Sequence, residues 1–176
     1  MRVYLTDLAS YNNGNLVGEW VSLPMSEEEL SSKIQEILEL GSATDGYEEA
    51  HQEYFITDSE CEFMEVGEYD NLDKLNEIAE AMENIDEDGV KAINFLMENQ
   101  LVKDIFEAIE NYEDSVRIYE NQSMEDIAYN FIQECYNLDD IPNIISNNID
   151  YESIARDMEI EGSYYKVDSD IYEYIG

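Results

Sequence analysis

The chain has 176 residues, of which 44 are Asp or Glu and only 8 are Lys or Arg, so its formal net charge is −36. Such a chain does not bind the phosphate backbone of nucleic acids, because that binding requires Lys and Arg to displace counterions, and an anionic membrane surface repels it as well. Hydrophobic residues nevertheless make up 44% of the sequence, with 14 Tyr and 5 Phe, so we expect a folded core rather than a disordered acidic tail.

The chain begins with a predicted β-hairpin. Residues 2–8 predict one strand, and residues 16–23, which include Trp20, predict a second strand that ends at Pro24. Between them, Tyr11–Asn15 is a turn sequence whose Asn-Gly pair tolerates positive φ, so we expect an enlarged hairpin loop.

A helix and a third strand complete this first unit. Ser26 followed by Glu29 is a capping box, which marks the start of the helix, and we expect the helix to end at Gly41. Residues 53–57 predict a third strand. Residues 1–61 are therefore expected to form an α+β domain with the element order β-β-α-β.

Residues 62–112 predict a central helical domain. Asp70 or Asn71 caps its first helix, Asp86 caps the second, and Leu101–Tyr112 predict a third. The links between these helices are short, which favours antiparallel neighbours.

The remaining residues, 113–176, predict a C-terminal α+β domain with a small antiparallel sheet. We expect, in order, a strand at 115–119, a helix opened by Ser123 with Asp126, a short helix near 141–146, a helix over 151–159 that Asp150 caps and Gly162 ends, and strands at 164–167 and 171–175. The predicted fold class is therefore α+β, with three small units in a row that form an elongated body.

The sequence indicates a cytoplasmic protein. Cys61 and Cys135 lie far apart and neither belongs to a CxxC pair, as expected for a reduced chain. The N-terminus does not resemble a signal peptide, and no segment approaches the roughly 18 apolar residues of a membrane span.

Motifs for catalysis and nucleotide binding are missing. His51 is the only histidine and matches no catalytic or metal motif, so we interpret it as a partly exposed surface residue. With 44 carboxylates, no pair stands out as a glycosidase site, although a hydrolase with an unrecognised pair stays open. We expect no enzyme activity, no catalytic residues, no metal and no cofactor.

A calcium-binding protein without enzymatic activity is the alternative function. Asn84–Gly89 resembles the first half of an EF-hand loop, but the twelfth position, which should be a bidentate Glu, is Phe95. We therefore interpret Asp86 as a helix cap, with Glu87 and Asp88 placed favourably at the positive end of the helix.

The charge itself is the leading functional feature. Residues 1–60, 61–110 and 111–176 carry net charges of −11, −12 and −13, so no part of the chain is neutral. Plausible partners are basic: a cation or a protein with a positive surface. A dimer would carry twice 36, or 72, negative charges, which is the charge of about 36 base pairs of duplex. DNA mimicry and a merely solvated acidic surface both fit this charge.

Four segments resemble the ArdA antirestriction family. Leu5–Trp20, with its Tyr-Asn-Asn-Gly turn followed by a Gly-x-Trp strand, is similar to the opening of that family. Glu53–Asp58, Tyr69–Ala79 and Asp150–Glu159 are similar to later family segments, in the same order and at similar spacing. Val17, where many members have His, is a departure, and Phe55 lies at a variable position.

This resemblance implies an elongated three-domain homodimer that is encoded on mobile genetic elements such as conjugative transposons and is not an enzyme. Such proteins mimic DNA in shape and charge. They occupy the DNA-binding groove of the methyltransferase core of Type I restriction-modification enzymes, and block restriction and often modification. We expect the dimer contact in the last unit, where Tyr and Ile are dense.

The carboxylates that stand in for phosphates are expected on exposed helix faces, with binding distributed over many of them. We assign this role to Glu27, Glu28, Glu36, Asp73, Glu77, Glu80, Glu87, Asp88, Glu110, Glu113, Asp114, Glu125 and Asp126.

Overall fold

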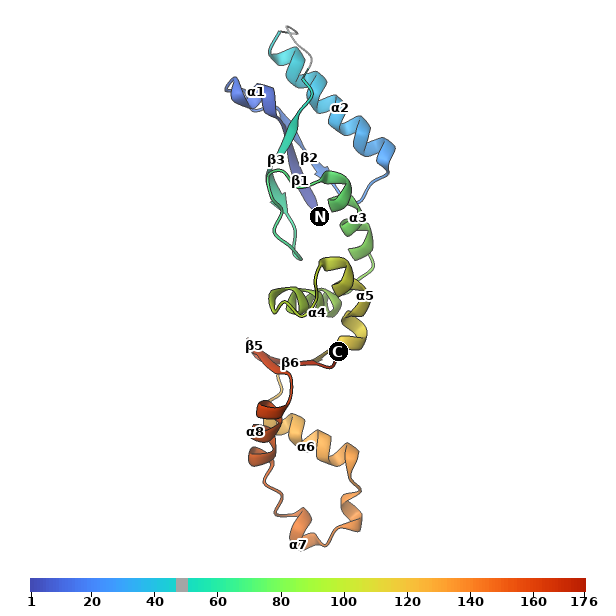
Figure 1. The fold of residues 1–176 in the computed structure, drawn as a ribbon, viewed down its shortest axis with the longest axis vertical. Helices are drawn as coiled ribbons and strands as arrows, with labels where there is room; N and C mark the ends of the chain where they lie inside the picture. Colours follow the sequence, from blue (N-terminus) through green and yellow to red (C-terminus); the bar gives the residue numbers. More distant parts are fainter. Residues whose placement is uncertain (47–50) are drawn as a thin grey trace. The chain divides into compact units, whose positions relative to one another are not determined.

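The computed structural model describes residues 1–46 and 51–176. These residues form eight α-helices, one short 3-10 helix and two three-stranded antiparallel sheets (Figure 1), which confirms the predicted α+β class. The chain divides into two compact units, Met1–Ile109 and Glu110–Gly176. The finer division into three domains and their elongated arrangement stay predictions.

The first sheet consists of β1 (Arg2–Asp7), β2 (Gly18–Ser22) and β3 (Tyr54–Glu60), in the order β2-β1-β3. β1 is the central strand and pairs antiparallel with both neighbours, so that Val3 lies opposite Val21 and Ser59. All three predicted strands are confirmed.

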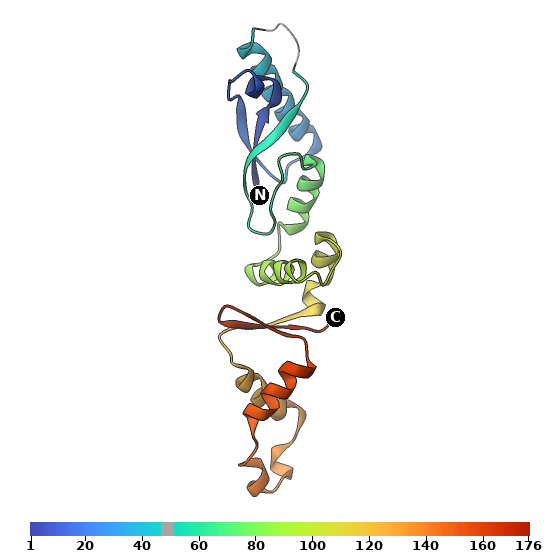
Figure 2. The ribbon, with the colours of Figure 1, turned by 60° about the vertical axis from the view of Figure 1, so that its left-hand side comes forward.

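One long helix, α2 (Glu27–Thr44), packs against this sheet (Figure 2). Leu30 and Ile37 of α2 join Val3 and Leu5 of β1 in the main hydrophobic core, and both strand residues are completely buried. The predicted capping box is present, because the Ser26 hydroxyl accepts a hydrogen bond from the Glu29 N–H and the Glu29 carboxylate accepts one from the Ser26 N–H.

The prediction that Gly41 ends α2 was wrong, because the helix continues to Thr44. A Cβ atom at Gly41 would lie 2.6 Å from Cγ of Asp7 and 2.9 Å from Nδ1 of His51. Glycine is therefore required here for the close approach of other side chains, not for a helix stop.

The loop between β1 and β2 contains a short helix, α1 (Leu8–Asn12), that the sequence pattern did not predict. The Asp7 carboxylate caps it by accepting a hydrogen bond of 2.6 Å from the Ser10 N–H. Gly14, with φ of 86°, then turns the chain toward β2, as expected for the Asn-Gly turn.

Three helices follow in the middle of the chain: α3 (Leu72–Met82), α4 (Glu87–Glu98) and α5 (Ile105–Ser115). Asn71 caps α3 and Asp86 caps α4, each through its side-chain oxygen. The third helix begins later than predicted. Leu72, Leu75 and Ala79 of α3 extend the core of the first sheet.

The second unit contains a second sheet, in the order β4-β6-β5, and two helices that pack together. Its elements are β4 (Val116–Tyr119), α6 (Met124–Cys135), η1 (Leu138–Asp140), α7 (Asn143–Ser146), α8 (Tyr151–Glu161), β5 (Tyr164–Val167) and β6 (Asp170–Tyr174). The predicted capping box of Ser123 with Asp126 and the cap by Asp150 are confirmed.

Two properties hold for every helix in residues 1–46 and 51–176. None combines the length and apolar composition needed to cross a membrane. None of the α-helices has a Lys or Arg in its last turn.

Candidate functional site

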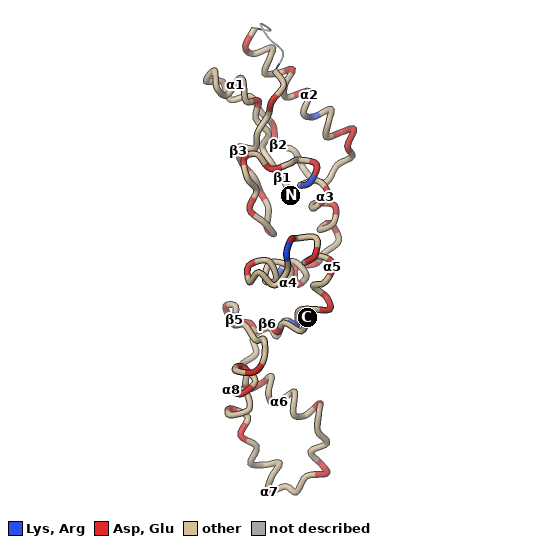
Figure 3. The backbone as a smooth tube through the Cα atoms, viewed as in Figure 1, with Lys and Arg blue, Asp and Glu red and all other residues tan. Residues whose placement is uncertain are grey.

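The candidate site is an acidic surface. The unit Met1–Ile109 contains 27 acidic and 5 basic residues, a net charge of −22, and Glu110–Gly176 contains 17 and 3, a net charge of −14. Figure 3 shows acidic residues distributed over both units with few basic ones among them. All 13 carboxylates that the sequence predicts as phosphate mimics are exposed.

The structure places eight of these carboxylates in the first unit and five in the second. They are Glu27, Glu28 and Glu36 on α2, Asp73, Glu77 and Glu80 on α3, Glu87 and Asp88 on α4, Glu110, Glu113 and Asp114 on α5, and Glu125 and Asp126 on α6.

Four of the predicted residues are brought together in one groove. The groove has a volume of about 360 Å³ and lies between the start of α2 and one face of α3. Its acidic lining residues are Glu27, Asp73, Glu77, Glu80 and Glu83. We call it the α2–α3 groove. Glu83 belongs to this set and was missed from the sequence, because it follows the last residue of α3 as its C-cap.

Helical spacing produces the acidic wall of this groove. Asp73, Glu77 and Glu80 are separated by four and three residues, so they share one face of α3. The opposite face of α3 carries Leu72 and Leu75, which are 2% exposed and pack in the core. The buried face thus fixes the rotation of the helix, and with it the direction of the acidic face.

A pair of hydrogen bonds ties the two sides of the groove together. The Asn76 side chain accepts a hydrogen bond of 2.9 Å from the Met25 N–H and donates one of 2.9 Å to the Met25 carbonyl oxygen. Because Met25 lies directly before the cap of α2, Asn76 fixes the position of Glu27 relative to α3.

The residues that the structure describes leave the groove carboxylates uncompensated. Among residues 1–46 and 51–176, no side chain forms an ion pair or hydrogen bond with any of the five carboxylate groups. Neighbouring like charges repel, and this uncompensated charge attracts Lys and Arg side chains of a partner.

Other predicted carboxylates do have internal partners. Lys33 donates to Glu36 at 3.0 Å, and Lys91 lies 3.0 Å from Asp88 and 3.3 Å from Glu87. Two hydrogen bonds raise the pKa of Lys91: the one to Asp88 has the larger effect and the one to Glu87 the smaller.

In the second unit, the Ser123 hydroxyl and N–H lower the pKa of Asp126 by hydrogen bonding, and Glu113 accepts a hydrogen bond from the Tyr112 hydroxyl. These carboxylates keep their negative charge, but some of their oxygen atoms already accept hydrogen bonds within the protein.

A buried polar cluster near the first sheet was missed from the sequence. His51, predicted to be a partly exposed surface residue, is of intermediate exposure, but its side chain is only 9% exposed and lies in this cluster. Its Nδ1 lies 2.9 Å from Oδ1 of Asp7, whose carboxylate is completely buried, and its Nε2 lies 3.8 Å from Asp45. Hydrogen bonds from Asn13 and Asn15 lower the pKa of Asp45. The contacts within this cluster connect the loop that contains α1 to the C-terminal end of α2.

The segment that resembles an EF-hand loop forms a helix start. Asp86 accepts a hydrogen bond of 2.9 Å from the Gly89 N–H, and Phe95, at the twelfth position, is 3% exposed in the core. In the part of the chain that the structure describes, no group of three or more His, Cys, Asp or Glu residues could hold a metal ion.

Comparison with known proteins identifies the family. A search of the curated proteins found no match. The family model described as antirestriction protein (ArdA) matches residues 3–173, which extend from β1 to β6 and include both units. Membership of that family implies an antirestriction function, exerted by an inhibitor rather than an enzyme. On this match, the chain belongs to the ArdA family of antirestriction proteins.

Proposed function

We propose that this protein mimics B-form DNA in charge and shape, and that it occupies the DNA-binding groove of a Type I restriction-modification enzyme. Occupation of that groove blocks both restriction and modification, because both activities require bound DNA. The observation that carries the proposal is the α2–α3 groove, where five exposed carboxylates gather and the described lining residues include no Lys or Arg.

The density of charge in this groove supports the proposal. The stretch from Asp73 to Glu83 spans about 15 Å of helix axis at 1.5 Å per residue. Four carboxylates of the groove, Asp73, Glu77, Glu80 and Glu83, lie along this length, or about one per 4 Å. A single strand of B-DNA carries one phosphate per 3.4 Å or so of axis. A row of Lys and Arg spaced for phosphates therefore meets a similar row of negative charges.

The proposal includes a homodimer in the cytoplasm whose contact lies in residues 110–176. Large apolar side chains of the second unit are exposed, among them Phe131 at 45%, Ile144 at 79% and Ile160 at 75%. Exposed apolar patches of this kind mark protein interfaces, and a second copy doubles the charge that the enzyme meets.

A competition experiment tests the proposed function. A fluorescent duplex is bound to the methyltransferase core of a Type I enzyme, and the protein is added at 50 and 200 mM salt. We expect displacement of the duplex that weakens as salt rises, because the contacts are electrostatic. Failure to displace the duplex at 50 mM salt refutes the proposal.

Two sets of five neutralising substitutions separate groove charge from total charge. The groove set is Glu27→Gln, Asp73→Asn, Glu77→Gln, Glu80→Gln and Glu83→Gln. The control set is Glu53→Gln, Glu68→Gln, Asp157→Asn, Glu159→Gln and Glu161→Gln, all at exposed positions. Both remove five charges. We expect the groove set to weaken competition roughly sixtyfold at low salt, and the control set to weaken it far less.

A further inference from the structure

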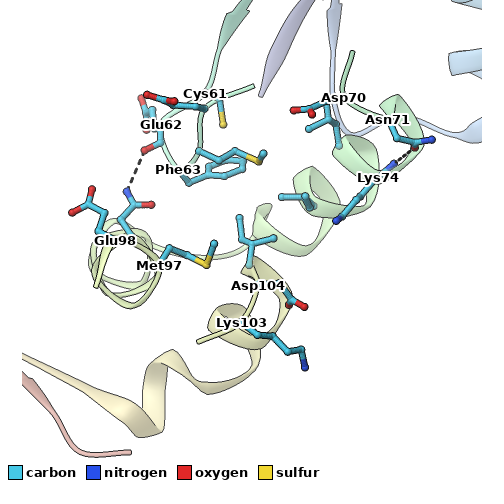
Figure 4. Close-up of a pocket in the computed structure, with 16 residues that line it drawn as sticks. Cys61, Glu62, Phe63, Asp70, Asn71, Lys74, Met97, Glu98, Lys103 and Asp104 are labelled. Carbon is cyan, nitrogen blue, oxygen red and sulfur yellow. Dashed lines mark hydrogen bonds between the residues drawn. The ribbon is translucent and has the colours of Figure 1, made fainter. Parts of the chain in front are cut away.

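A larger cavity of about 890 Å³ lies in the first unit, between the segment after β3 and helices α3, α4 and α5 (Figure 4). It shares no residue with the α2–α3 groove and contains none of the 13 predicted carboxylates. Its apolar lining consists of Phe63, Met64, Leu75, Ile78, Met97 and Ile105. We call it the Phe63–Met97 pocket.

Hydrogen bonds hold the walls of this pocket. The Asn94 side chain of α4 donates a hydrogen bond of 3.2 Å to the carbonyl oxygen of Glu62, and this bond connects α4 to the segment after β3. Asp70 accepts a hydrogen bond of 2.8 Å from the Gly67 N–H, and Asn71 caps α3. The pocket is therefore built into the fold rather than left between loose segments.

The charges around the pocket select its occupant. Five carboxylates line it with two lysines, Lys74 and Lys103. Neither lysine has an acidic group within ion-pair distance among residues 1–46 and 51–176. The lining residues of the pocket therefore carry a net charge of −3. This charge disfavours a phosphate or another anion as the occupant, and it favours an apolar side chain that is flanked by Lys or Arg on the partner protein.

We propose that the Phe63–Met97 pocket receives an apolar side chain that projects from the basic DNA-binding groove of the restriction-modification enzyme. This inference rests on the proposed function. DNA-binding proteins insert apolar side chains between base steps, and base-modifying enzymes stack a base that is turned out of the duplex between aromatic or apolar side chains. A DNA mimic whose surface consisted only of carboxylates would leave these apolar side chains of the enzyme in contact with negatively charged groups. The volume of the pocket accommodates a large side chain together with its flanking groups.

Salt dependence distinguishes this apolar contact from the carboxylate contacts. An apolar contact exchanges few ions, so its loss shifts the Kd without changing the slope of log Kd against log salt concentration. Met97→Ala is the main variant, because Met97 is 36% exposed and its truncation leaves the core intact. Phe63→Ala is the second, and Leu40→Ala, at a 58% exposed position on α2, is the matched control.

We expect Met97→Ala and Phe63→Ala each to raise the Kd for the methyltransferase core about tenfold at every salt concentration with an unchanged slope. Leu40→Ala should leave both the Kd and the slope unchanged. A Kd within twofold of the unmodified protein for both pocket variants overturns the inference while the proposed function stands. Absence of binding by the unmodified protein overturns the proposed function and this inference together.

The pocket cysteine supplies a second measurement that leaves the apolar side chains intact. Cys61 lines the pocket and is partly exposed, whereas Cys135 lies on α6. In a Cys135→Ser variant, alkylation of Cys61 by iodoacetamide should slow at least tenfold in the complex with the methyltransferase core. The Met97→Ala substitution should restore part of the rate at saturating enzyme. An unchanged alkylation rate in the complex overturns the inference.

Discussion

Replacement of His51 by Ala is expected to destabilise the first unit by about 3 kcal/mol. The Asp7 carboxylate is completely buried and accepts two hydrogen bonds, one from the Ser10 N–H to Oδ1 at 2.6 Å and one from Nδ1 of His51 to Oδ2 at 3.0 Å. His51→Ala removes one of these two donors.

The magnitude follows from what remains around Asp7. Loss of a hydrogen bond costs about 0.5–1.5 kcal/mol, and a buried acceptor that is left without its donor costs about 1–3 kcal/mol more. The Ser10 N–H stays in place, so we expect a total of about 3 kcal/mol. This is a large share of the roughly 5–15 kcal/mol by which domains are stable.

Urea unfolding followed by Trp20 fluorescence measures this effect, because Trp20 is the only tryptophan and lies on β2 of the same unit. With a slope near 2 kcal/mol per M, the midpoint should fall by about 1.5 M. His51→Asn is the matched control, since its amide nitrogen can replace the Nδ1 donor, and it should recover much of the loss. If His51→Asn is as destabilising as His51→Ala, or if His51→Ala moves the midpoint by less than about 0.3 M, the hydrogen bond to Asp7 does not stabilise the fold.

Three further predictions concern the groove, the polar cluster and the dimer. Asn76→Ala removes both hydrogen bonds to Met25, so we expect a loss of about 2 kcal/mol in urea unfolding and weaker competition with DNA; unchanged competition would show that the groove needs no fixed geometry. Because the pKa of Asp45 is lowered in the folded state, its contribution to stability is complete above its ordinary pKa of about 3.9 and is lost as pH falls through the lower folded value. Asp45→Asn should therefore flatten the loss of stability on acidification, and identical pH profiles would exclude this role. Ile144→Glu with Ile145→Glu should give monomers in sedimentation experiments if the second unit forms the dimer contact, whereas a persistent dimer would place the contact elsewhere.

Elements with local signals were predictable from the sequence. The capping boxes at Ser26 and Ser123 depend on residues three positions apart, so the sequence alone contains the relevant chemistry. The amphipathic pattern of α3 likewise predicted which face carries acids. The α1 helix was missed because it has only five residues and its cap, Asp7, is also the last residue of a strand.

Long-range contacts account for what the sequence did not predict. Gly41 looked like a helix stop, yet its role depends on Asp7 and His51, which only the fold brings near. The α2–α3 groove depends on Asn76 meeting Met25, 51 residues earlier. Neither pairing has a local signature. Individual acids could therefore be placed on helix faces, whereas their gathering into a groove could not be foreseen.

The absence of Lys and Arg from the last turns of the α-helices in residues 1–46 and 51–176 has a consequence for the electric field of the protein. Each helix C-terminus carries about half a negative charge from its aligned peptide dipoles. A Lys or Arg in the last turn would compensate this charge. Here it adds to the field of the carboxylates, and no proton can remove it. Part of the negative potential near these helix ends thus belongs to the backbone, and it does not depend on the ionisation of the carboxylates.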